Sequence, residues 1–410
     1  MKRVVITGGA GFSPIGSSWK EIKANLAAEK TGTQYMTEWD VYEGLTTRLG
    51  APIKNFTMPP HYTRKHLRSM GRVAQLGTLA TEQALENAGL LEELPRLSRG
   101  KIGVSYGSSM GSTDAIAVFG HMLNKHVTDG LNANSYLKMM SHTAAVNIGV
   151  HFGLQGRIIT TSSACTSGSQ GIGYAYEAIK SGAQDIMVAG GAEELCPTQA
   201  AVFDTLYATS TCNDTPECSP RPFDRDRDGL VIGEGACTIV LEELSFAQAR
   251  GATILAEIVG YGTNSDGMHV TQPNSETMEV AMRLALEDAG VNSTDIGYVS
   301  AHGTATDRGD VAETQATRRA LGRAIPISAF KSYTGHTLGA CGALEAWISI
   351  HMMRECWFHG TANLRNLDAD CGDLDYLTGS GRDITCDYVM SNNFAFGGIN
   401  TSLIFKLWDQ

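Results

Sequence analysis

The sequence has no apolar run long enough to span a membrane and no excess of positive charge. It contains 32 Lys and Arg residues but 43 Asp and Glu residues. The resulting net charge of −11 argues against binding to a nucleic-acid backbone. The nine cysteines include no Cys-x-x-Cys pair, which fits reduced thiols better than disulfides or zinc. The apolar residues 4–6 are too few for a signal-peptide core. We therefore expect a cytoplasmic protein without a membrane span.

Two segments about half the chain apart resemble each other, which indicates a duplication. Residues 84–90 read Ala-Leu-Glu-Asn-Ala-Gly-Leu, and residues 285–291 read Ala-Leu-Glu-Asp-Ala-Gly-Val. Each segment ends a helical pattern at a glycine and then leads into Ile-Gly and a predicted strand. At 410 residues the chain also exceeds one ordinary core. We expect two pseudo-symmetric α/β halves, residues 1–254 and 255–410.

Cys165 lies at a predicted junction between a buried strand and a helix. Residues 157–161 are rich in β-branched side chains, and from residue 171 apolar side chains recur with the spacing of one helix face. Unpaired N–H groups and the positive end of the dipole at a helix start favour the thiolate, which is the nucleophile. Most cysteines in such a chain are structural, however, so this assignment depends on partners elsewhere.

Two histidines lie in glycine-rich segments whose small side chains would let a ligand approach. They are His302 in residues 301–306 (Ala-His-Gly-Thr-Ala-Thr) and His336 in residues 335–340 (Gly-His-Thr-Leu-Gly-Ala). The duplication would bring His336 and Cys165 into one pocket, with Lys331 close by and Glu313 on a predicted helix. One thiol, two imidazoles, an amine and a carboxylate suit acyl transfer through a thioester. Neither histidine has a partner at metal-ligand spacing, so we expect no metal site.

Together these motifs resemble those of the β-ketoacyl-acyl carrier protein synthases, condensing enzymes of the thiolase superfamily. The matching segments are residues 163–165, 302–306, 331–340 and 391–398, with 222–224, 227–229 and 233–235. The resemblance runs from residue 4 to the C-terminus, and several motifs in one order are far more specific than any single motif. It implies a thiolase-like α/β fold with α-β-α-β-α layers. It also implies no resident cofactor, because phosphopantetheine arrives on the acyl carrier protein.

The resemblance implies a decarboxylative Claisen condensation in fatty acid biosynthesis. Cys165 would accept the acyl chain from acyl carrier protein as a thioester. His302 and His336 would donate hydrogen bonds to the thioester carbonyl of malonyl-carrier protein, where negative charge develops as CO₂ leaves. Lys331 would support the histidine pair, and Glu313 would bind Lys331.

The resemblance also assigns residues around the substrate. Thr304 and Thr306 would hydrogen-bond the phosphopantetheine arm. The backbone N–H groups of Cys165 and Phe396 would form an oxyanion hole, and Phe396 would gate the acyl pocket with adjacent glycines as a hinge. An ordinary core aromatic fits Phe396 equally well. Met110 falls where elongating relatives vary the depth of the acyl pocket.

The pathway and the assembly stay open at this level. Residues 193–196 and 213–217 look more like the branch of the family that accepts unsaturated chains. Relatives that elongate aryl polyenes or other polyketides provide an alternative to fatty acid synthesis. The family is typically homodimeric, although some polyene-type relatives pair with a chain-length-factor-like partner.

A basic cluster offers a docking surface for the strongly acidic carrier protein. It comprises Arg64, Lys65, Arg68 and Arg72, with Lys125 as a further candidate. Such a surface would steer association and weaken with salt. A solvated helix face is the plain alternative.

Three rival classes explain fewer of the motifs. An NAD(P)-dependent short-chain reductase would use residues 7–12 as a dinucleotide turn and Tyr176 with Lys180, but it leaves both histidines unexplained. A non-catalytic partner subunit would lack the nucleophile. A thiolase would use a second cysteine near the C-terminus, and Cys371 and Cys386 lie outside any matching motif.

Overall fold

The 11-stranded sheet of the computed structural model is built from two sets of strands. The structure describes residues 1–97 and 100–408. The N-terminal half contributes β1 (Val4–Phe12), β4 (Ile102–Gly107), β5 (Ile158–Thr161), β6 (Ile186–Glu193) and β8 (Gly235–Glu243). The C-terminal half contributes β9 (Ala256–Ser265), β10 (Ile296–Ser300), β11 (Pro326–Ser328), β15 (Tyr388–Ala395) and β16 (Ile399–Leu407), and β13 (Asp375–Tyr376) extends its outer edge.

Both halves have the same strand order. From the centre of the sheet outward, β1-β8-β6-β4-β5 run one way and β9-β16-β15-β10-β11 run the other. In chain order this is the first, fifth, fourth, second and third of the five strands in each half. The halves meet where β1 pairs antiparallel with β9, between Val4 opposite Ile258 and Ile6 opposite Ala256. The repeated order confirms the predicted pseudo-symmetric duplication.

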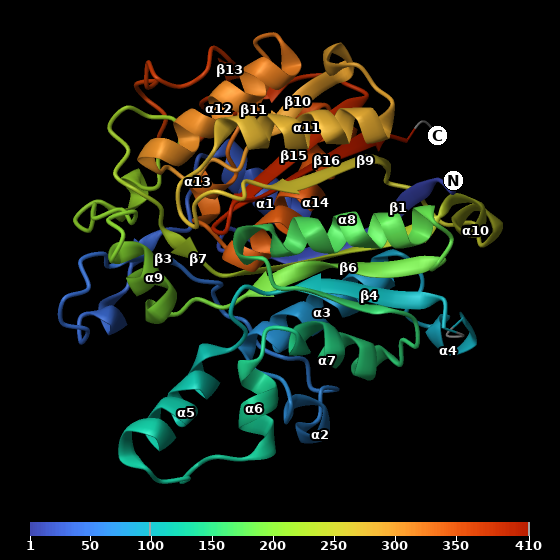
Figure 1. Ribbon diagram of the computed structural model, residues 1–410. Coiled ribbons are helices and arrows are strands. Elements are labelled where there is room, and N and C mark those ends of the chain that lie inside the picture. The colour runs from blue at the N-terminus through green and yellow to red at the C-terminus, as the bar shows by residue number, and fades with distance from the viewer. Residues whose placement is uncertain (98–99, 409–410) are drawn as a thin grey trace.

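Helices lie in three layers with the strands between them (Figure 1). In the middle layer, α8 (Ser167–Lys180) and α14 (Cys341–Arg354) pack against each other. On the outside of the N-terminal half, α3 (Arg72–Asn87) contacts β1, β6 and β8, and α7 (Thr143–Phe152) contacts β4. On the outside of the C-terminal half, α11 (Ser275–Ala289) contacts β9 and β16, and α12 (Asp307–Leu321) packs on α11. This is the expected α-β-α-β-α arrangement.

The central position of α14 follows from its sequence, which is apolar on every side. Nearly all of its residues are buried, including Leu344, Trp347 and Ile348. A helix without a polar stripe must be covered all round. Glu345 is buried in the same helix, and a buried carboxylate requires a polar partner. No helix in the described part of the chain is long and apolar enough to cross a membrane.

The glycine-rich opening of the chain is the interior of β1, not a turn. A Cβ added at Gly8 would come within 2.5 Å of the carbonyl oxygen of Ala84 on α3. One added at Gly9 would come within 2.8 Å of Trp347 on α14. The glycines therefore let helices pack closely against both faces of the strand. The reading of this segment as a dinucleotide-binding turn, which requires a strand-to-helix loop, is wrong.

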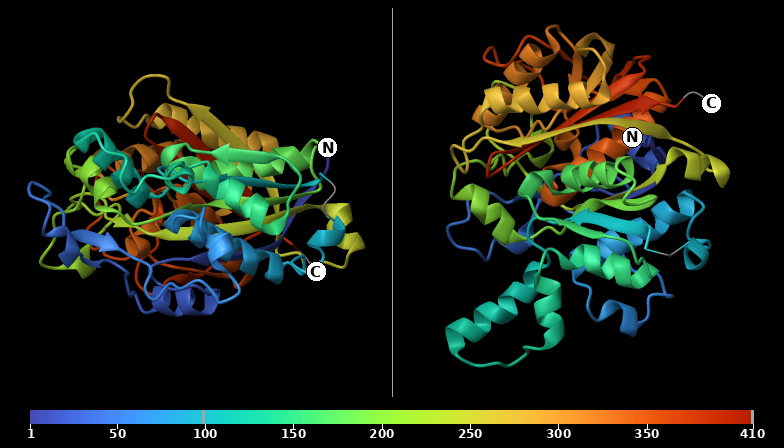
Figure 2. Two further views of the ribbon diagram at one scale, coloured as in Figure 1. Left: turned by 90° about the horizontal axis from the view of Figure 1, so that it is seen from below. Right: turned by 45° about the vertical axis from the view of Figure 1, so that its right-hand side comes forward.

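Two helices of the N-terminal half project from the body of the molecule (Figure 2). They are α5 (Thr113–Lys125) and α6 (Ala133–Met139), inserted between β4 and α7. The C-terminal half has only α12 between the equivalent strands β10 and β11. Apolar side chains are exposed on and beside this α5–α6 arm, namely Ile116, Leu123, Val127, Tyr136 and Leu137.

Candidate active site

Cys165 lies in a short 3₁₀ turn, η2 (Ala164–Thr166), between β5 and α8. The side chain is 5% exposed, and burial raises the pKa of its thiol to about 12. The nearby Lys331 and the backbone N–H groups of Phe396 and Cys165 lower this pKa, but they do not offset burial. Burial therefore opposes the resting thiolate that the helix start was expected to favour. The position of Cys165 at a helix start is as predicted.

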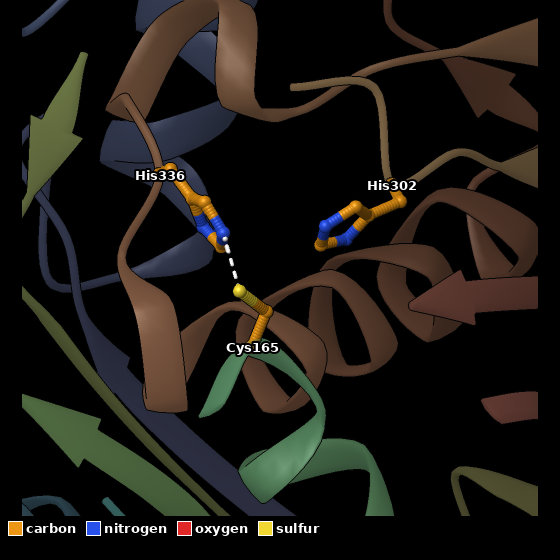
Figure 3. Close-up of side chains that lie close together, drawn as sticks. All are labelled: Cys165, His302 and His336. Atoms are coloured by element: carbon orange, nitrogen blue, oxygen red, sulfur yellow. Dashed lines mark hydrogen bonds between the residues drawn. The ribbon is translucent and has the colours of Figure 1, made fainter. Parts of the chain in front are cut away.

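His336 lies directly beside this thiol, in the segment between α13 (Lys331–Thr334) and η5 (Leu338–Ala340). Its Nε2 is 2.9 Å from Cys165 Sγ (Figure 3). The backbone N–H of Leu338 donates to His336 Nδ1 at 3.2 Å, so Nδ1 is an acceptor. Burial, supported by the charge of Lys331, lowers the pKa of His336 well below its ordinary value. The imidazole is therefore neutral and carries its hydrogen on Nε2, which faces the sulfur.

His302 follows β10 and faces the same thiol from the other side (Figure 3). Its ring centroid is 5.2 Å from that of His336, and the two rings are perpendicular at 88°. Lys331 Nζ lies 3.1 Å from His302 Nδ1. Burial, followed by the charge of Lys331, lowers the pKa of His302 well below its ordinary value. Because the ammonium of Lys331 donates to Nδ1, the hydrogen of the neutral ring lies on Nε2.

Lys331 forms its ion pair with Glu345 of α14. The resemblance had implied a pair with Glu313, and that part of the prediction is wrong. Lys331 Nζ is 2.5 Å from Glu345 Oε1, and both side chains are almost fully buried. Glu313 instead accepts the backbone N–H groups of His302 at 2.6 Å and Gly303 at 2.7 Å. Glu313 therefore holds the backbone that carries His302. Sequence reasoning missed Glu345, although a carboxylate in an otherwise apolar helix was an available signal.

A cavity of about 530 Å³ reaches the thiol and both imidazoles. Its further lining includes the two predicted pantetheine-binding threonines, Thr304 and Thr306, whose hydroxyls lie 2.8 Å apart. The cavity has the size and the mixed polar and apolar walls of a small-molecule site. The predicted catalytic histidines and threonines are thus brought to one space with Cys165.

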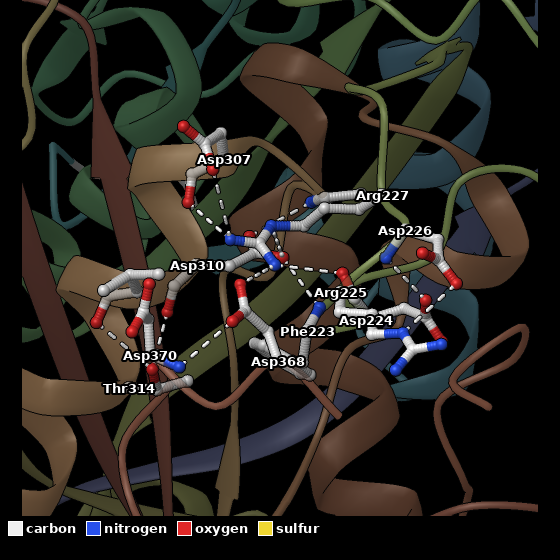
Figure 4. A network of polar contacts seen from close by, with 12 residues as sticks. Phe223, Asp224, Arg225, Asp226, Arg227, Asp307, Asp310, Thr314, Asp368 and Asp370 are labelled. Atoms are coloured by element: carbon white, nitrogen blue, oxygen red, sulfur yellow. Dashed lines mark hydrogen bonds and ion pairs between the residues drawn. The ribbon is translucent and has the colours of Figure 1, made fainter. Parts of the chain in front are cut away.

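A buried arginine fixes the segment that carries these threonines (Figure 4). Arg227 donates to the backbone carbonyl of Thr306 at 3.1 Å and pairs with Asp368 at 2.5 Å. Asp310, 3.8 Å from Arg227, accepts the backbone N–H of Ala305 at 3.1 Å. Ala305 adopts a left-handed conformation with φ of 63°. The motif around Arg227 matched the family pattern, but its role in holding this turn emerges only in three dimensions.

Phe396 follows β15 and lines the same cavity as Cys165. Its ring centroid is 5.1 Å from that of Phe203, which also lines the cavity. Gly397 and Gly398, with φ of 88° and 69°, continue the chain in a conformation that side chains rarely adopt. The backbone position supports the oxyanion-hole assignment. Gating by Phe396 stays a prediction.

Met110 is half-buried and does not line this cavity among the described residues. Its backbone N–H lies 3.3 Å from Glu193 Oε1. Glu193 is a buried carboxylate that also accepts from Ser109 and from the backbone of Gly339. The sequence did not single out this connection between the Met110 loop and the segment after His336. A role of Met110 in acyl length stays a prediction.

The expected docking residues do not form one continuous helix face. Arg64, Lys65 and Arg68 are exposed on or beside α2 (Arg64–Leu67), and Lys125 is exposed at the end of α5. Figure 1 shows α2 and α5 as separate features of the same end of the molecule. Arg72 does not contribute free charge, because its guanidinium pairs with Glu234 at 2.8 Å. That part of the predicted basic cluster is wrong.

Tyr176 and Lys180, the pair that a short-chain reductase would use, form hydrogen bonds at the junction of the two halves. Lys180 Nζ is 2.7 Å from the Tyr176 hydroxyl and 2.5 Å from Asp288 of α11. Tyr176 also donates to the backbone carbonyl of Val259 at 2.9 Å. The pair joins the two halves and does not line the cavity, so it is not a reductase site.

The protonation of the site disfavours a bound metal ion, although three of its side chains lie close enough together to coordinate one. One donor atom each from Cys165, His302 and His336 falls within 4.8 Å of the others. The Nε2 hydrogens point toward this space, and the ammonium of Lys331 lies against His302. Both features oppose a cation. The expectation of no metal and no resident cofactor stays a prediction.

Comparisons with known proteins identify the family. A duplicated α-β-α-β-α fold with a cysteine and two histidines at its centre defines a thiolase-like condensing enzyme, an acyltransferase. Residues 1–247 match "Beta-ketoacyl synthase, N-terminal domain" and residues 255–365 match "Beta-ketoacyl synthase, C-terminal domain". The chain belongs to the β-ketoacyl synthase family.

Individual relatives cover the whole chain. 3-Oxoacyl-[acyl-carrier-protein] synthase 2 of Vibrio cholerae serotype O1 is 39% identical over 99% of both proteins. The crystal structure of a β-ketoacyl synthase from Burkholderia phymatum has 57% identity, a TM-score of 0.98 and full coverage of both chains. The ishigamide ketosynthase/chain length factor has 31% identity and a TM-score of 0.89, again over both full chains.

Proposed function

We propose that the protein is a 3-oxoacyl-[acyl-carrier-protein] synthase that elongates acyl chains in fatty acid biosynthesis. One observation carries the proposal: the Cys165 thiol and two Nε2–H donors, from His302 and His336, face one cavity. The names of the full-length relatives support the same reaction.

The first half-reaction transfers an acyl group to the enzyme. Cys165 Sγ attacks the thioester carbon of acyl-carrier protein, the bond to the pantetheine sulfur breaks, and the thiol proton ends on the departing pantetheine. The backbone N–H groups of Cys165 and Phe396 stabilise the oxyanion of the tetrahedral intermediate. Since the thiol rests protonated, deprotonation accompanies attack.

The second half-reaction uses the two histidines. Their Nε2–H groups donate to the thioester carbonyl of malonyl-carrier protein, and CO₂ departs to leave an enolate. Neutral donors suit this step because the charge on that oxygen appears only as the carbon–carbon bond breaks. The enolate carbon then attacks the acyl-Cys165 carbonyl and forms the new carbon–carbon bond. The carbon–sulfur bond breaks, the 3-oxoacyl product stays on the carrier protein, and the Cys165 thiolate that leaves takes up a proton from solvent. The reaction requires no resident cofactor.

Intact-mass measurement with acylated carrier proteins tests the proposal. We expect the wild-type protein to gain the mass of the acyl group and Cys165→Ala to gain none. A wild type that gains no acyl mass from any donor between four and sixteen carbons would refute the assignment.

An alternative substrate class is the aryl polyene or another polyketide chain. The similarity to the ishigamide ketosynthase/chain length factor supports keeping this candidate. Aryl-enoyl donors should be included in the same panel. Faster acylation and condensation with those donors than with saturated chains would assign the protein to a polyene pathway.

Two exposed apolar features support a homodimer. β5 is the outer strand of its half of the sheet and exposes 44% of Ile158, so its free edge could pair with a second copy. The α5–α6 arm beside it exposes further apolar side chains. Light scattering of the purified chain should give twice the monomer mass. A monomer that dimerises only with a co-expressed relative would support the heterodimer with a chain-length-factor-like partner.

The cysteines support a cytoplasmic location. All nine are free, which fits a reducing environment. The exposed cations Arg64, Lys65 and Arg68 support carrier-protein docking near α2, with Lys125 on the arm as a second contact.

A further inference from the structure

Asn393 of β15 places its amide between His302 and α14. The residue is fully buried. Its Nδ2 lies 2.6 Å from Glu345 Oε2 and 3.4 Å from His302 Nδ1. The opposite orientation of the amide would direct its oxygen at a carboxylate, so the hydrogen-bond partners fix the orientation.

Asn393 completes the hydrogen bonding of a buried ion pair. One carboxylate oxygen of Glu345 receives the Lys331 ammonium, and the other receives the Asn393 amide. The side chains of Lys331 and Glu345 are 1% and 0% exposed. Burial raises the pKa of Glu345, and the contacts with Lys331 and Asn393 oppose that rise. A buried ion pair stays ionised only when its remaining lone pairs and hydrogens are satisfied.

The ionised state of this pair decides what His302 offers to the substrate. An ammonium at Lys331 can only donate to His302 Nδ1, which keeps the ring hydrogen on Nε2. If Lys331 passed a proton to Glu345, the neutral amine would accept a hydrogen from Nδ1. The ring would then change tautomer and present a bare Nε2 lone pair to the cavity.

No other charged group determines this tautomer. The titratable groups that face His302 are Lys331 of α13, Glu345 and Cys341 of α14, Cys165 of η2, His336, and Glu313 of α12. Glu313 contacts His302 through its backbone N–H and not through the ring. The Cys341 thiol donates to the Cys165 carbonyl at 3.3 Å.

We propose that Asn393 is a positioning residue that holds His302 in the tautomer with hydrogen on Nε2, acting through Glu345 and Lys331. The proposal rests on the proposed function, because only decarboxylation requires a hydrogen-bond donor at this position. The tautomer itself can be measured without any turnover.

Ring ¹⁵N chemical shifts of histidine-labelled protein test the tautomer directly, with the His302 signals assigned by their loss in His302→Asn. We expect a protonated Nε2 and a bare Nδ1 in the wild type, and a mixture or the reverse in Asn393→Ala. Asn392→Ala is the matched control, because Asn392 is the adjacent residue, is equally buried and makes no hydrogen bond through its amide among the described residues. A wild-type ring protonated on Nδ1, or an unchanged ring in Asn393→Ala, would overturn the proposal.

Half-reaction rates supply the second test. Asn393→Ala should slow decarboxylation of malonyl-carrier protein by roughly 100-fold, the effect of losing one oxyanion donor. Acyl transfer to Cys165 should slow much less, because His302 does not assist it and only the charge of Lys331, which lowers the pKa of the thiol, is lost. Asn393→Asp should recover decarboxylation at low pH, where a proton shared with Glu345 replaces the amide donor.

The outcomes separate the two proposals. Equal slowing of both half-reactions, or pH profiles of Asn393→Ala and Asn393→Asp that coincide with the wild type, would refute the positioning role. Absence of acyl transfer in the wild type would instead refute the proposed function and leave the measured tautomer valid.

Discussion

In the N-terminal half, β5 leads through five residues, 162–166, into α8, whereas in the C-terminal half β11 leads through residues 329–340 into α14. The short connection places Cys165 at its helix start. The long connection includes α13 and carries both Lys331 and His336. Because α8 and α14 pack together, the two connections meet at one cavity. The duplicated elements keep the same order, and Cys165, Lys331 and His336 lie in the segments between strand and helix, where the two halves differ.

The two connections also differ in their surroundings. Cys165 belongs to an apolar cluster that includes Met36, Trp39 and Phe203. The C-terminal connection contains a buried ion pair, Lys331 with Glu345, which belongs to a polar network behind His302. An apolar pocket suits an acyl chain, and a fixed polar network suits stabilisation of a developing negative charge.

Removal of the Cys165 thiol should have the largest effect on activity, and it should distinguish the reaction step of the N-terminal half from that of the C-terminal half. We expect Cys165→Ala to lose condensation by at least about 10³-fold while malonyl-carrier protein is still decarboxylated, because the histidines are intact. Product formation and CO₂ release are measured together. Cys237→Ala, a buried cysteine on β8 outside the cavity, is the control and should keep both activities. Loss of decarboxylation in Cys165→Ala would contradict the assignment of acyl transfer to the N-terminal half and decarboxylation to the C-terminal half.

The buried ion pair of the C-terminal half should matter for folding more than the partly exposed pair that joins the two halves. Lys331→Met leaves the Glu345 carboxylate buried without its cation and should lower the free energy of unfolding by about 3–5 kcal/mol. Lys180→Met on α8 is the matched control. Its pair with Asp288 is partly exposed, so the loss should be about 1 kcal/mol or less. Urea denaturation measures both, and equal losses would contradict the comparison.

Glu313 gives the C-terminal half a pH dependence of stability. Burial raises the pKa of Glu313 to about 8, and the N–H groups of Gly303 and His302 only partly oppose this. The folded protein thus retains a proton that the unfolded chain loses near its ordinary pKa of 4.5. Stability should fall as pH rises from about 4.5 to about 8.

The measurement compares unfolding free energies of the wild type and Glu313→Gln across this range. The difference isolates Glu313 from Asp310, whose raised pKa of about 6 has the same sign. Parallel curves for the two proteins would show that Glu313 does not supply the slope.

The smallest expected effect concerns docking on the N-terminal half. Arg64→Ala with Lys65→Ala should raise KM for acyl-carrier protein by roughly 3- to 10-fold at low salt and leave kcat unchanged. The difference should fade at high salt, where surface charges are screened. Lys20→Ala, an exposed cation on α1 (Trp19–Ala27), is the control. If Lys20→Ala raised KM as much as Arg64→Ala with Lys65→Ala, the basic cluster would be an ordinary solvated helix face and not a docking surface.

Local patterns predicted the elements well, because these depend on short-range features. The helix after Cys165 and the repeated Ala-Leu-Glu segments follow from periodicity and glycine placement. The strand before Cys165 was expected to be buried, and that expectation is wrong, because β5 lies at the edge of the sheet and only Thr161 of it is buried. The resemblance assigned Glu313 to Lys331, whereas in the structure Lys331 pairs with Glu345 and Glu313 holds the backbone of His302. Arg72 was also misread as a free cation, since its partner Glu234 lies far along the chain.

The sequence by itself determined the class of fold, the duplication and the identities of Cys165, His302, His336 and Lys331, since motif spacing and composition are properties of the chain. Only the tertiary structure decided their protonation states. Burial overrides the helix start at Cys165, and the tautomers of both histidines depend on donors contributed by other segments. Desolvation and directed hydrogen bonds are properties of a site that exists only after distant segments have packed.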